Sequence, residues 1–178
     1  MTENKKVAYV FPGQGAQTVG MGKDLYDNFD SVKALFKKAD YAVGFPLTKI
    51  FFEGPEEELR KTSNAQPALL AVSIACLIAA QEVAGKNLPV PSFMAGHSLG
   101  EYTALAAANA VDFSTAVFLA KERGRLMYEA GLKQQGGMVA VIGIEETVLA
   151  KICQQTGTVI ANFNSPGQLV ISGATENI

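Results

Sequence analysis

The sequence is poor in cysteine: its 178 residues include only Cys76 and Cys153. The two lie far apart along the chain and lack the spacing of metal ligands, which excludes a cysteine-based zinc site. We interpret both thiols as structural residues of a protein in a reducing compartment and expect a cytoplasmic location. The first residues also lack the apolar run of a secretory signal, which agrees with that location.

Runs of charge and long apolar runs are missing as well. Fifteen basic and seventeen acidic residues are spread along the chain, for a net charge of −2. This balance predicts no nucleic-acid partner and no anionic membrane surface. The longest apolar stretch, 68–80, is broken by Ser73 and is too short to cross a bilayer, so we expect a buried helix there. A hydrophobic content of 48% predicts a globular protein with one substantial core, or with one core and a small satellite.

The sequence does contain an alternation of short apolar segments and helical patterns, which predicts an α/β fold. Two short buried strands are expected, at 7–11 and 91–95, and each runs into a loop with glycines. Helical patterns are expected at 22–29, 31–43, 66–83, 99–108 and 112–131. Pro67 suits the first position of the third helix, and Asp112 is the expected N-cap of the last.

The pattern changes after Gly136 and Gly137. The elements expected there are strands at 138–142, 159–163 and 169–172, a helix at 145–155, and the start of a helix capped by Thr175. The last two strands are expected to pair as a hairpin. This order is most of a ferredoxin-like motif without its second helix and last strand, so we expect the chain to be cut within that motif.

The segment Gly96-His-Ser-Leu-Gly100 matches the GxSxG nucleophile elbow. Glycines flank the serine because the turn from strand to helix is sharp and leaves no room for side chains. The apolar strand before it and the helical pattern after it would expose the Ser98 hydroxyl at a helix N-terminus. On this motif alone, a glycine-rich turn with a capping serine is the alternative.

A second glycine loop, at 12–17, also follows an expected strand. In a parallel sheet both loops would lie at the carboxyl edge of neighbouring strands, where α/β proteins place their sites. The GxGxxG spacing of a dinucleotide site is missing. A backbone close to the Ser98 hydroxyl suits an oxyanion hole, and a simple tight turn is an equal alternative.

Arg123 is the most informative single residue. At about 100° per residue, it lies on one helix face with Ala116, Leu119, Ala120, Leu126, Met127 and Ala130. Burying a guanidinium without a partner costs several kcal/mol, so an anion should meet it. The anion is either an internal carboxylate such as Glu101 or a carboxylate of the substrate, and spacing alone slightly favours the internal pair.

His97, the only histidine, is the immediate neighbour of Ser98. Side chains of adjacent residues in a sharp turn diverge, whereas a general base must reach the proton of the nucleophile. His97 is therefore a poor base. An imidazole packed beside the site and hydrogen-bonded to the backbone is the favoured interpretation.

Five segments together make the sequence resemble the malonyl-CoA:acyl carrier protein transacylases of fatty acid synthesis and, more broadly, the acyltransferase domains of polyketide synthases. In the order of the family, they are Phe11-Pro-Gly-Gln-Gly-Ala-Gln17, Gln66-Pro-Ala-Leu-Leu70, Gly96-His-Ser-Leu-Gly-Glu-Tyr102, Arg123-Gly-Arg-Leu-Met127 and Asn162-Phe-Asn-Ser-Pro-Gly-Gln168. The resemblance implies an α/β-hydrolase-like large subdomain, with 1–134 as its N-terminal part. It also implies a ferredoxin-like small subdomain, with 135–178 as its first part.

The resemblance also implies catalytic roles. Ser98 would be the nucleophile that carries the malonyl group as an ester, and the backbone N–H groups of Gln14 and Leu99 would form the oxyanion hole. Arg123 would hold the free carboxylate of the malonyl group, which reverses the preference for an internal pair.

The implied reaction is of the ping-pong type, with malonyl-CoA and acyl carrier protein as partners. Malonyl passes from coenzyme A to Ser98, and the phosphopantetheine thiol of acyl carrier protein then takes it. Gln66 would be a polar pocket residue close to the acyl group, and Asn162 would face the cleft from the small subdomain. No metal or prosthetic group is needed.

In one respect the sequence departs from the family, whose catalytic histidine follows the small subdomain and is not reached within these 178 residues. We therefore expect either a companion chain with the C-terminal remainder or an inactive fragment, and in both cases exposed apolar surface. A serine hydrolase or thioesterase is the alternative enzyme. Arg123 argues against it, because such an enzyme has no carboxylate to hold in its acyl pocket.

Overall fold

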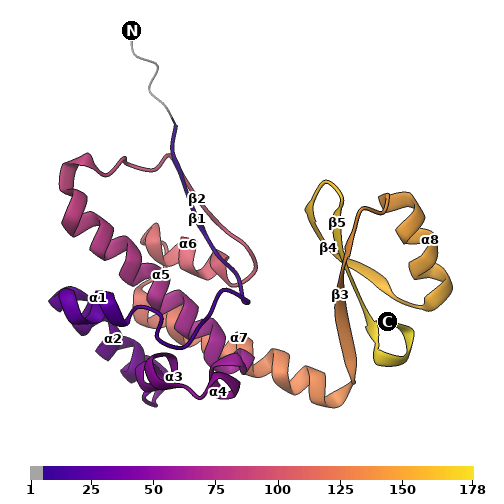
Figure 1. The fold of residues 1–178 in the computed structure, drawn as a ribbon, viewed down its shortest axis with the longest axis horizontal. Coiled ribbons are helices and arrows are strands. Elements are labelled where there is room, and N and C mark those ends of the chain that lie inside the picture. The colour runs from indigo at the N-terminus through magenta and orange to yellow at the C-terminus, as the bar shows by residue number, and fades with distance from the viewer. Residues whose placement is uncertain (1–5) are drawn as a thin grey trace, which may run out of the picture. The chain divides into compact units, whose positions relative to one another are not determined.

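The structure is a computed structural model that describes residues 6–178 as two compact units, one up to Tyr128 and one over Glu129–Ile178 (Figure 1). The expectation about an N-terminal signal falls partly on residues 1–5, which lie outside the described residues. The elements that begin in the first unit are β1 (Ala8–Phe11), α1 (Lys23–Asn28), α2 (Asp30–Val43), α3 (Leu47–Glu53), α4 (Glu56–Arg60), α5 (Thr62–Ala84), η1 (Gly85–Asn87), β2 (Phe93–Gly96), α6 (Gly100–Ala107) and α7 (Phe113–Lys133). Those of the second unit are β3 (Gly136–Ile142), α8 (Glu146–Thr156), β4 (Val159–Ser165), β5 (Gln168–Ala174) and η2 (Thr175–Asn177).

Strands β1 and β2 form a parallel pair whose carboxyl ends lie together, with Phe11 opposite Gly96. The expectation of two buried strands is wrong for one face of this pair, where Val10 is 73% and Phe93 59% exposed. Side chains alternate between the faces of a strand, and α6 packs on the face that carries Gly96. The opposite face is uncovered in residues 6–178, which confirms the expected exposure of apolar surface.

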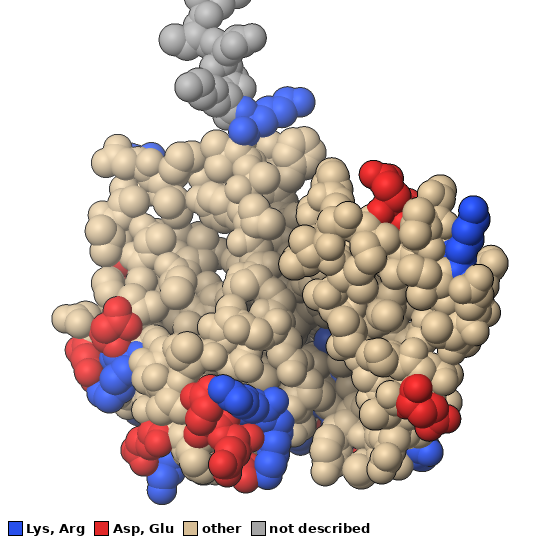
Figure 2. Space-filling view, turned by 45° about the vertical axis from the view of Figure 1, so that its right-hand side comes forward, with Lys and Arg blue, Asp and Glu red and all other residues tan. Residues whose placement is uncertain are grey.

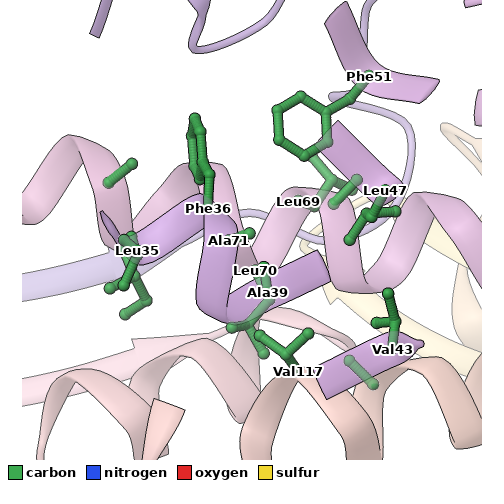
Figure 3. Packing of buried hydrophobic residues seen from close by; sticks show 14 of the residues in the cluster. Leu35, Phe36, Ala39, Val43, Leu47, Phe51, Leu69, Leu70, Ala71 and Val117 are labelled. Carbon is green, nitrogen blue, oxygen red and sulfur yellow. The ribbon is translucent and has the colours of Figure 1, made fainter. Parts of the chain in front are cut away.

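The core of the first unit lies where α2, α3, α5 and α7 meet (Figure 3). Each helix contributes fully buried side chains, among them Phe36, Phe51, Leu70 and Val117. The buried residues of α2 recur every three or four positions, as an amphipathic helix requires: Val32, Leu35, Phe36, Ala39 and Val43. The substantial core expected from the composition is therefore confirmed.

Helix α5 begins at Thr62, four residues before the expected start. The assignment of Pro67 to the first helical position is wrong, because the helix is already formed there: the N–H groups of Asn64 and Ala65 both donate to the Lys61 carbonyl oxygen. Pro67 lies in the second turn, where it lacks the N–H that would bond to Ser63. The early start places Thr62 and Gln66 four residues apart, on one face of the helix.

Two helices, α3 and α4, occupy a stretch for which the sequence analysis predicts no element. Their signals are short: Leu47 and Phe51 are buried four residues apart in α3, and α4 follows Pro55 with three glutamates in its first turn. The expected cap at Thr175 is wrong. Thr175 lies inside the single turn η2, whose preceding residue is Ala174.

The second unit is an antiparallel sheet in the order β3–β5–β4, with α8 packed against it. Because β3 and β4 both run antiparallel to β5, they are parallel to each other and are connected through α8. This is a split β-α-β arrangement, because β5 lies between β3 and β4. The antiparallel pairing of β4 with β5 confirms the expected hairpin of the last two strands. The buried core of the unit consists of Leu149, Cys153 and Leu169.

Helix α5 together with η1, Thr62–Asn87, is long and apolar enough to cross a membrane by length and composition, because the helix extends beyond the apolar stretch 68–80 at both ends. The core helix of a soluble protein passes the same test of length and composition, and Leu69, Leu70 and Ile74 of α5 do lie in the core. Cys76, in the same helix, is exposed because one stripe of α5 faces outward, whereas Cys153 is buried.

Charged side chains of both signs lie next to one another on the face drawn in Figure 2. Ion pairs of the described residues join neighbours within one helix or at its end, such as Arg125 with Glu122 (2.8 Å) in α7 and Lys61 with Glu58 (2.6 Å) at the end of α4. These pairs join neighbours in the sequence and are exposed or half-buried, so each contributes little stability. This face therefore carries charges of both signs.

Candidate active site

Ser98 lies at the sharp turn between β2 and α6, with its side chain exposed. Its φ of 53° falls in the left-handed region, which residues with a side chain rarely adopt. A Cβ on Gly96 would lie 1.9 Å from the backbone of Gly100, and a Cβ on Gly100 would lie 2.3 Å from the Phe11 carbonyl oxygen. Both glycines of the motif are therefore required by space, and they allow a strained turn that presents the serine hydroxyl.

The glycine loop at 12–17 lies against this turn, which confirms that the two loops share one edge of the parallel pair. The N–H of His97 donates to the Phe11 carbonyl oxygen at 3.2 Å. A Cβ on Gly13 would lie 2.8 Å from the His97 carbonyl oxygen and 3.0 Å from its Nδ1, so the imidazole lies beside this loop. The interpretation of His97 as a residue packed beside the site agrees with this contact.

Arg123 reaches Ser98 directly from α7. Its Nη2 donates a hydrogen bond to Ser98 Oγ at 2.9 Å, and its Nη1 donates to Gln66 Oε1 at 2.6 Å. Gln66, on α5, is fully buried, and its Nε2 donates to the sulfur of Met127 at 3.3 Å. Because the sulfur accepts from the amide nitrogen, the amide oxygen of Gln66 is directed at the guanidinium.

Arg123 forms no ion pair with an acidic residue anywhere in residues 6–178. The internal pair with Glu101 is therefore a wrong expectation, and Glu101 is exposed on α6. The reason lies in the helix face: Arg123 is only half-buried, and Leu126 and Met127 beside it are 57% and 48% exposed. In addition to its two hydrogen bonds, the guanidinium lies 5.9 Å from the centre of the Tyr102 ring. Within the described part of the chain, the groups that contact this positive charge are therefore neutral.

Leu99 and Gln14 flank the serine from two different segments. Leu99 directly precedes α6, and its side chain is fully buried. Because Leu99 stands at the start of the helix, its backbone N–H has no partner within the helix. Gln14 is exposed in the loop at 12–17, and its Oε1 accepts a hydrogen bond from the Thr62 hydroxyl. Thr62 has no signal in the sequence, because this contact joins residues 48 positions apart and no motif marks it.

Asn162 lies on β4 in the second unit, half-buried and opposite Val170 at an irregularity of the strand register. The structure thus brings Ser98, Arg123 and Gln66 into one hydrogen-bonded group, whereas it describes Asn162 only within its own unit. Among residues 6–178, no three His, Cys, Asp or Glu side chains gather as a metal site would require.

The fold and the site define a mixed α/β protein that presents a serine hydroxyl on a strained turn, bonded to an arginine. The chain belongs to the acyl transferase domain family, whose sequence profile matches residues 8–178.

Curated relatives share this sequence over almost its whole length. The malonyl CoA-acyl carrier protein transacylase of Escherichia coli K12 is 46% identical over 175 residues, which cover 96% of this chain and 56% of that protein. The protein of the same name from Bacillus subtilis 168 is 44% identical over 178 residues, 97% of this chain and 55% of that protein. The chain therefore spans a little over half the length of these relatives.

Solved structures agree. An acyl carrier protein S-malonyltransferase from Vibrio cholerae superposes with a TM-score of 0.89 at 42% identity, covering 97% of this chain and 57% of the other. A malonyl-transacylase in complex with its type II polyketide synthase acyl-carrier protein also superposes with a TM-score of 0.89, at 44% identity, covering 97% of this chain and 56% of the other. These similarities confirm the mixed α/β fold.

Proposed function

We propose that this chain holds the nucleophile and the acyl-binding arginine of an acyltransferase that moves a malonyl group from coenzyme A to the phosphopantetheine thiol of acyl carrier protein. The observation that carries the proposal is the hydrogen bond from Arg123 to Ser98 Oγ. A guanidinium without an acidic partner in the described chain, in contact with a serine hydroxyl, fits an acyl group that ends in a carboxylate. The names of the relatives support this substrate.

In the first half-reaction, Ser98 on its nucleophile elbow attacks the thioester carbonyl carbon while the Oγ proton passes to a general base. The tetrahedral intermediate then breaks its C–S bond, and the coenzyme A sulfur leaves with a proton. In the second half-reaction the carrier thiol attacks the malonyl ester, and Ser98 regains its proton. His97 is poorly placed as the base, because it is the immediate neighbour of Ser98 in the turn.

The negative charge of the intermediate would be stabilised by the backbone N–H groups of Gln14 and Leu99. Two observations support this role: the loop of Gln14 packs against the turn of Ser98, and Leu99 opens the helix after it. Removing one donor of an oxyanion hole typically lowers kcat by a factor of about 10²–10³. These two peptides are therefore the proposed electrostatic part of the site.

Gln66 would hold the guanidinium of Arg123 in the orientation that receives the malonyl carboxylate. Its full burial and its two hydrogen bonds support a fixed orientation. Asn162 is proposed as a residue that faces the acyl group from the second unit, by its match to the family segment that begins there. Because the two cysteines are free and the relatives include enzymes of bacteria, we also propose a cytoplasmic location.

We also propose that the two units are parts of two known kinds of subdomain. Residues 1–134 would be the N-terminal part of an α/β-hydrolase-like subdomain, which the parallel pair β1–β2 and the strand-to-helix turn at Ser98 support. Residues 135–178 would be the first part of a ferredoxin-like subdomain, which the split β-α-β arrangement supports. A companion chain with the remainder of such a protein stays a prediction.

A serine hydrolase or thioesterase would use the same turn and the same N–H donors. Arg123 disfavours it, since an unneutralised guanidinium on the serine hydroxyl lowers affinity for acyl groups that end in apolar carbon. The names of the relatives disfavour it as well.

Intact-mass measurement after incubation with malonyl-CoA tests the proposed function. The protein, with all of its natural sequence, should gain one malonyl group, and Ser98→Ala should gain none. Arg123→Ala should lose malonyl loading by about 100-fold, as expected for a lost charged hydrogen-bonding partner, while loading from acetyl-CoA falls far less.

Acetyl-CoA is the matched control, because it differs from malonyl-CoA by the carboxylate alone. Equal losses of malonyl and acetyl loading in Arg123→Ala would contradict the role of the arginine as carboxylate binder. A malonyl adduct that persists in Ser98→Ala would contradict the nucleophile.

A further inference from the structure

Thr62, the first residue of α5, lies where three segments of the site meet. Its hydroxyl donates to the side chain of Gln14 in the loop after β1. Its carbonyl oxygen would lie 2.4 Å from a Cβ on Gly124, which means that α7 approaches this turn at backbone distance, one residue after Arg123. One helical turn further along α5 is Gln66, which holds Arg123.

The loop that carries Gln14 needs such an anchor. The loop contains Gly13 and Gly15, and Gly15 adopts a φ of 113°. Because glycine has no Cβ, the backbone of this loop has more conformational freedom than the backbone of a loop without glycine. On one side the loop is fixed by the contact of Gly13 with the His97 carbonyl oxygen. At Gln14 itself, the Thr62 hydroxyl is the described side-chain contact that joins the loop to a helix of the core.

We propose that Thr62 is a positioning residue for the oxyanion hole. By holding the Gln14 side chain, the Thr62 hydroxyl fixes the Gln14 peptide so that its N–H points toward the carbonyl oxygen of the group on Ser98. The inference rests on the proposed function, in which the Gln14 N–H stabilises the oxyanion. It adds that one turn of α5 sets the position of both the oxyanion donor, through Thr62, and the carboxylate binder, through Gln66 and the contact with Gly124.

Thr62→Val removes the hydroxyl and keeps the shape of the side chain, so it tests this role directly. Misplacing a catalytic donor by a fraction of an ångström lowers the rate without removing the donor, so we expect kcat for malonyl loading to fall by about tenfold. KM for malonyl-CoA should stay within about twofold, because Arg123 and Gln66 are unchanged. Thr62→Ser keeps the hydroxyl and should recover most of the lost rate.

Gln14→Ala provides a second measurement of the same contact, since it removes the acceptor and keeps the backbone N–H. It should reproduce the defect of Thr62→Val, and the double variant should be no slower than either single variant. Thr156→Val, which removes a hydroxyl hydrogen bond in the second unit, is the matched control and should load malonyl at the wild-type rate. Full activity in Thr62→Val, an effect on KM alone, or additive losses in the double variant would each overturn the proposal.

Acylation of Ser98 by p-nitrophenyl acetate separates this inference from the proposed function. That ester has no carboxylate, yet its tetrahedral intermediate uses the same oxyanion hole. If the wild-type protein reacts with the ester and not with malonyl-CoA, the malonyl assignment fails. Thr62→Val should still slow the ester reaction about tenfold, and an unchanged rate there would overturn the role of Thr62 on its own.

Discussion

The two units of this chain differ in what holds them together. Among residues 6–178, the first unit packs eighteen buried hydrophobic residues, mostly from helices, into one core, whereas the second unit has three, Leu149, Cys153 and Leu169, beneath a sheet. The strained residue of the site, Ser98 with its φ of 53°, belongs to the first unit. Strained backbone persists only where the surrounding structure fixes it. We therefore attribute the strained conformation of Ser98 to the large core of the first unit.

Glycines are required for two different physical reasons in this chain. In the first unit, Gly96, Gly100 and Gly124 are required because backbone from another segment lies where a Cβ would be. In the second unit, Gly143 and Gly167 have open space around them and are required for their positive φ. Both kinds occur in both units, since Gly44 is a turn glycine of the first unit and Gly173 a close-packed glycine of the second, but the glycines next to Ser98 are required by close packing.

Gly100→Ala is expected to have the largest effect. The added methyl would meet the Phe11 carbonyl oxygen at 2.3 Å, so either α6 or β1 must move, at a cost of about 3 kcal/mol or more. Because Ser98 lies in the turn that leads into α6, malonyl loading should fall by more than about 100-fold. Loading is measured by intact mass, and stability by urea unfolding.

Gly167→Ala is the matched control in the second unit. Its Cβ would meet nothing within 4 Å, and only the φ of 80° is unfavourable, so the cost should be about 1 kcal/mol. Malonyl loading should stay near the wild-type value. Similar losses of stability in the two variants would remove the distinction between glycines of packing and glycines of turns.

Leu149→Ala should destabilise the whole second unit, although it removes only one leucine side chain. Removing a fully packed leucine side chain costs about 3 kcal/mol, and this unit has only two other buried core residues to retain its sheet. Amide hydrogen exchange should therefore show loss of protection throughout β3, β4 and β5.

Leu70→Ala removes the same atoms from the core of the first unit and is the matched control. Its cost is similar, but the remaining core should keep the amides of α2 and α5 protected. Loss of protection throughout the first unit in Leu70→Ala would show that the size of the core does not determine its tolerance.

Much of the fold could be predicted from local patterns. The turn at Ser98 follows from two glycines between an apolar strand and a helical pattern, and the hairpin of β4 and β5 follows from apolar runs around Pro166 and Gly167. The start of α5 could not, because Pro67 indicates a helix start and the structure tolerates this proline in the second turn.

The site could be predicted where one residue carries the signal. Arg123 in a partly apolar helix face signals a need for a partner, although the pattern could not reveal that the described partners are neutral. Gln66 is found by the resemblance alone. Thr62 and the sulfur contact of Met127 depend on how α5, α7 and the loop after β1 pack, and no spacing within the sequence encodes that packing.

Tyr102→Leu should have a smaller effect, and that effect should be on the binding of malonyl-CoA at Arg123 and not on the stability of either unit. The ring of Tyr102 lies 5.9 Å from the guanidinium carbon of Arg123, and such a cation–π contact contributes about 0.5–1 kcal/mol. We expect KM for malonyl-CoA to rise about threefold with kcat nearly unchanged. Tyr102→Phe keeps the ring and should resemble the wild type; an equal rise in KM for both variants would contradict the role of the ring.

Asp112→Asn should have the smallest effect and tests α7, the helix that begins in the first unit and ends in the second. Hydrogen bonds from the Thr115 hydroxyl and from its N–H (3.0 Å) hold the pKa of Asp112 below its ordinary value of 3.8. A folded-state pKa below the unfolded one contributes stability above the unfolded value, and this contribution is lost as the pH falls through the folded value. Asparagine also caps helices but does not titrate, so the wild type should have a slightly higher urea midpoint at pH 7.

The pH dependence of that difference is the decisive measurement. Between about pH 7 and pH 5 the difference in urea midpoint between wild type and Asp112→Asn should be constant, because the carboxylate is ionised in both the folded and the unfolded state. Below about pH 4 the unfolded carboxylate takes up its proton first, and the difference should shrink. A difference that stays constant down to about pH 2, or that grows in acid, would show that the charge of Asp112 does not stabilise the start of α7.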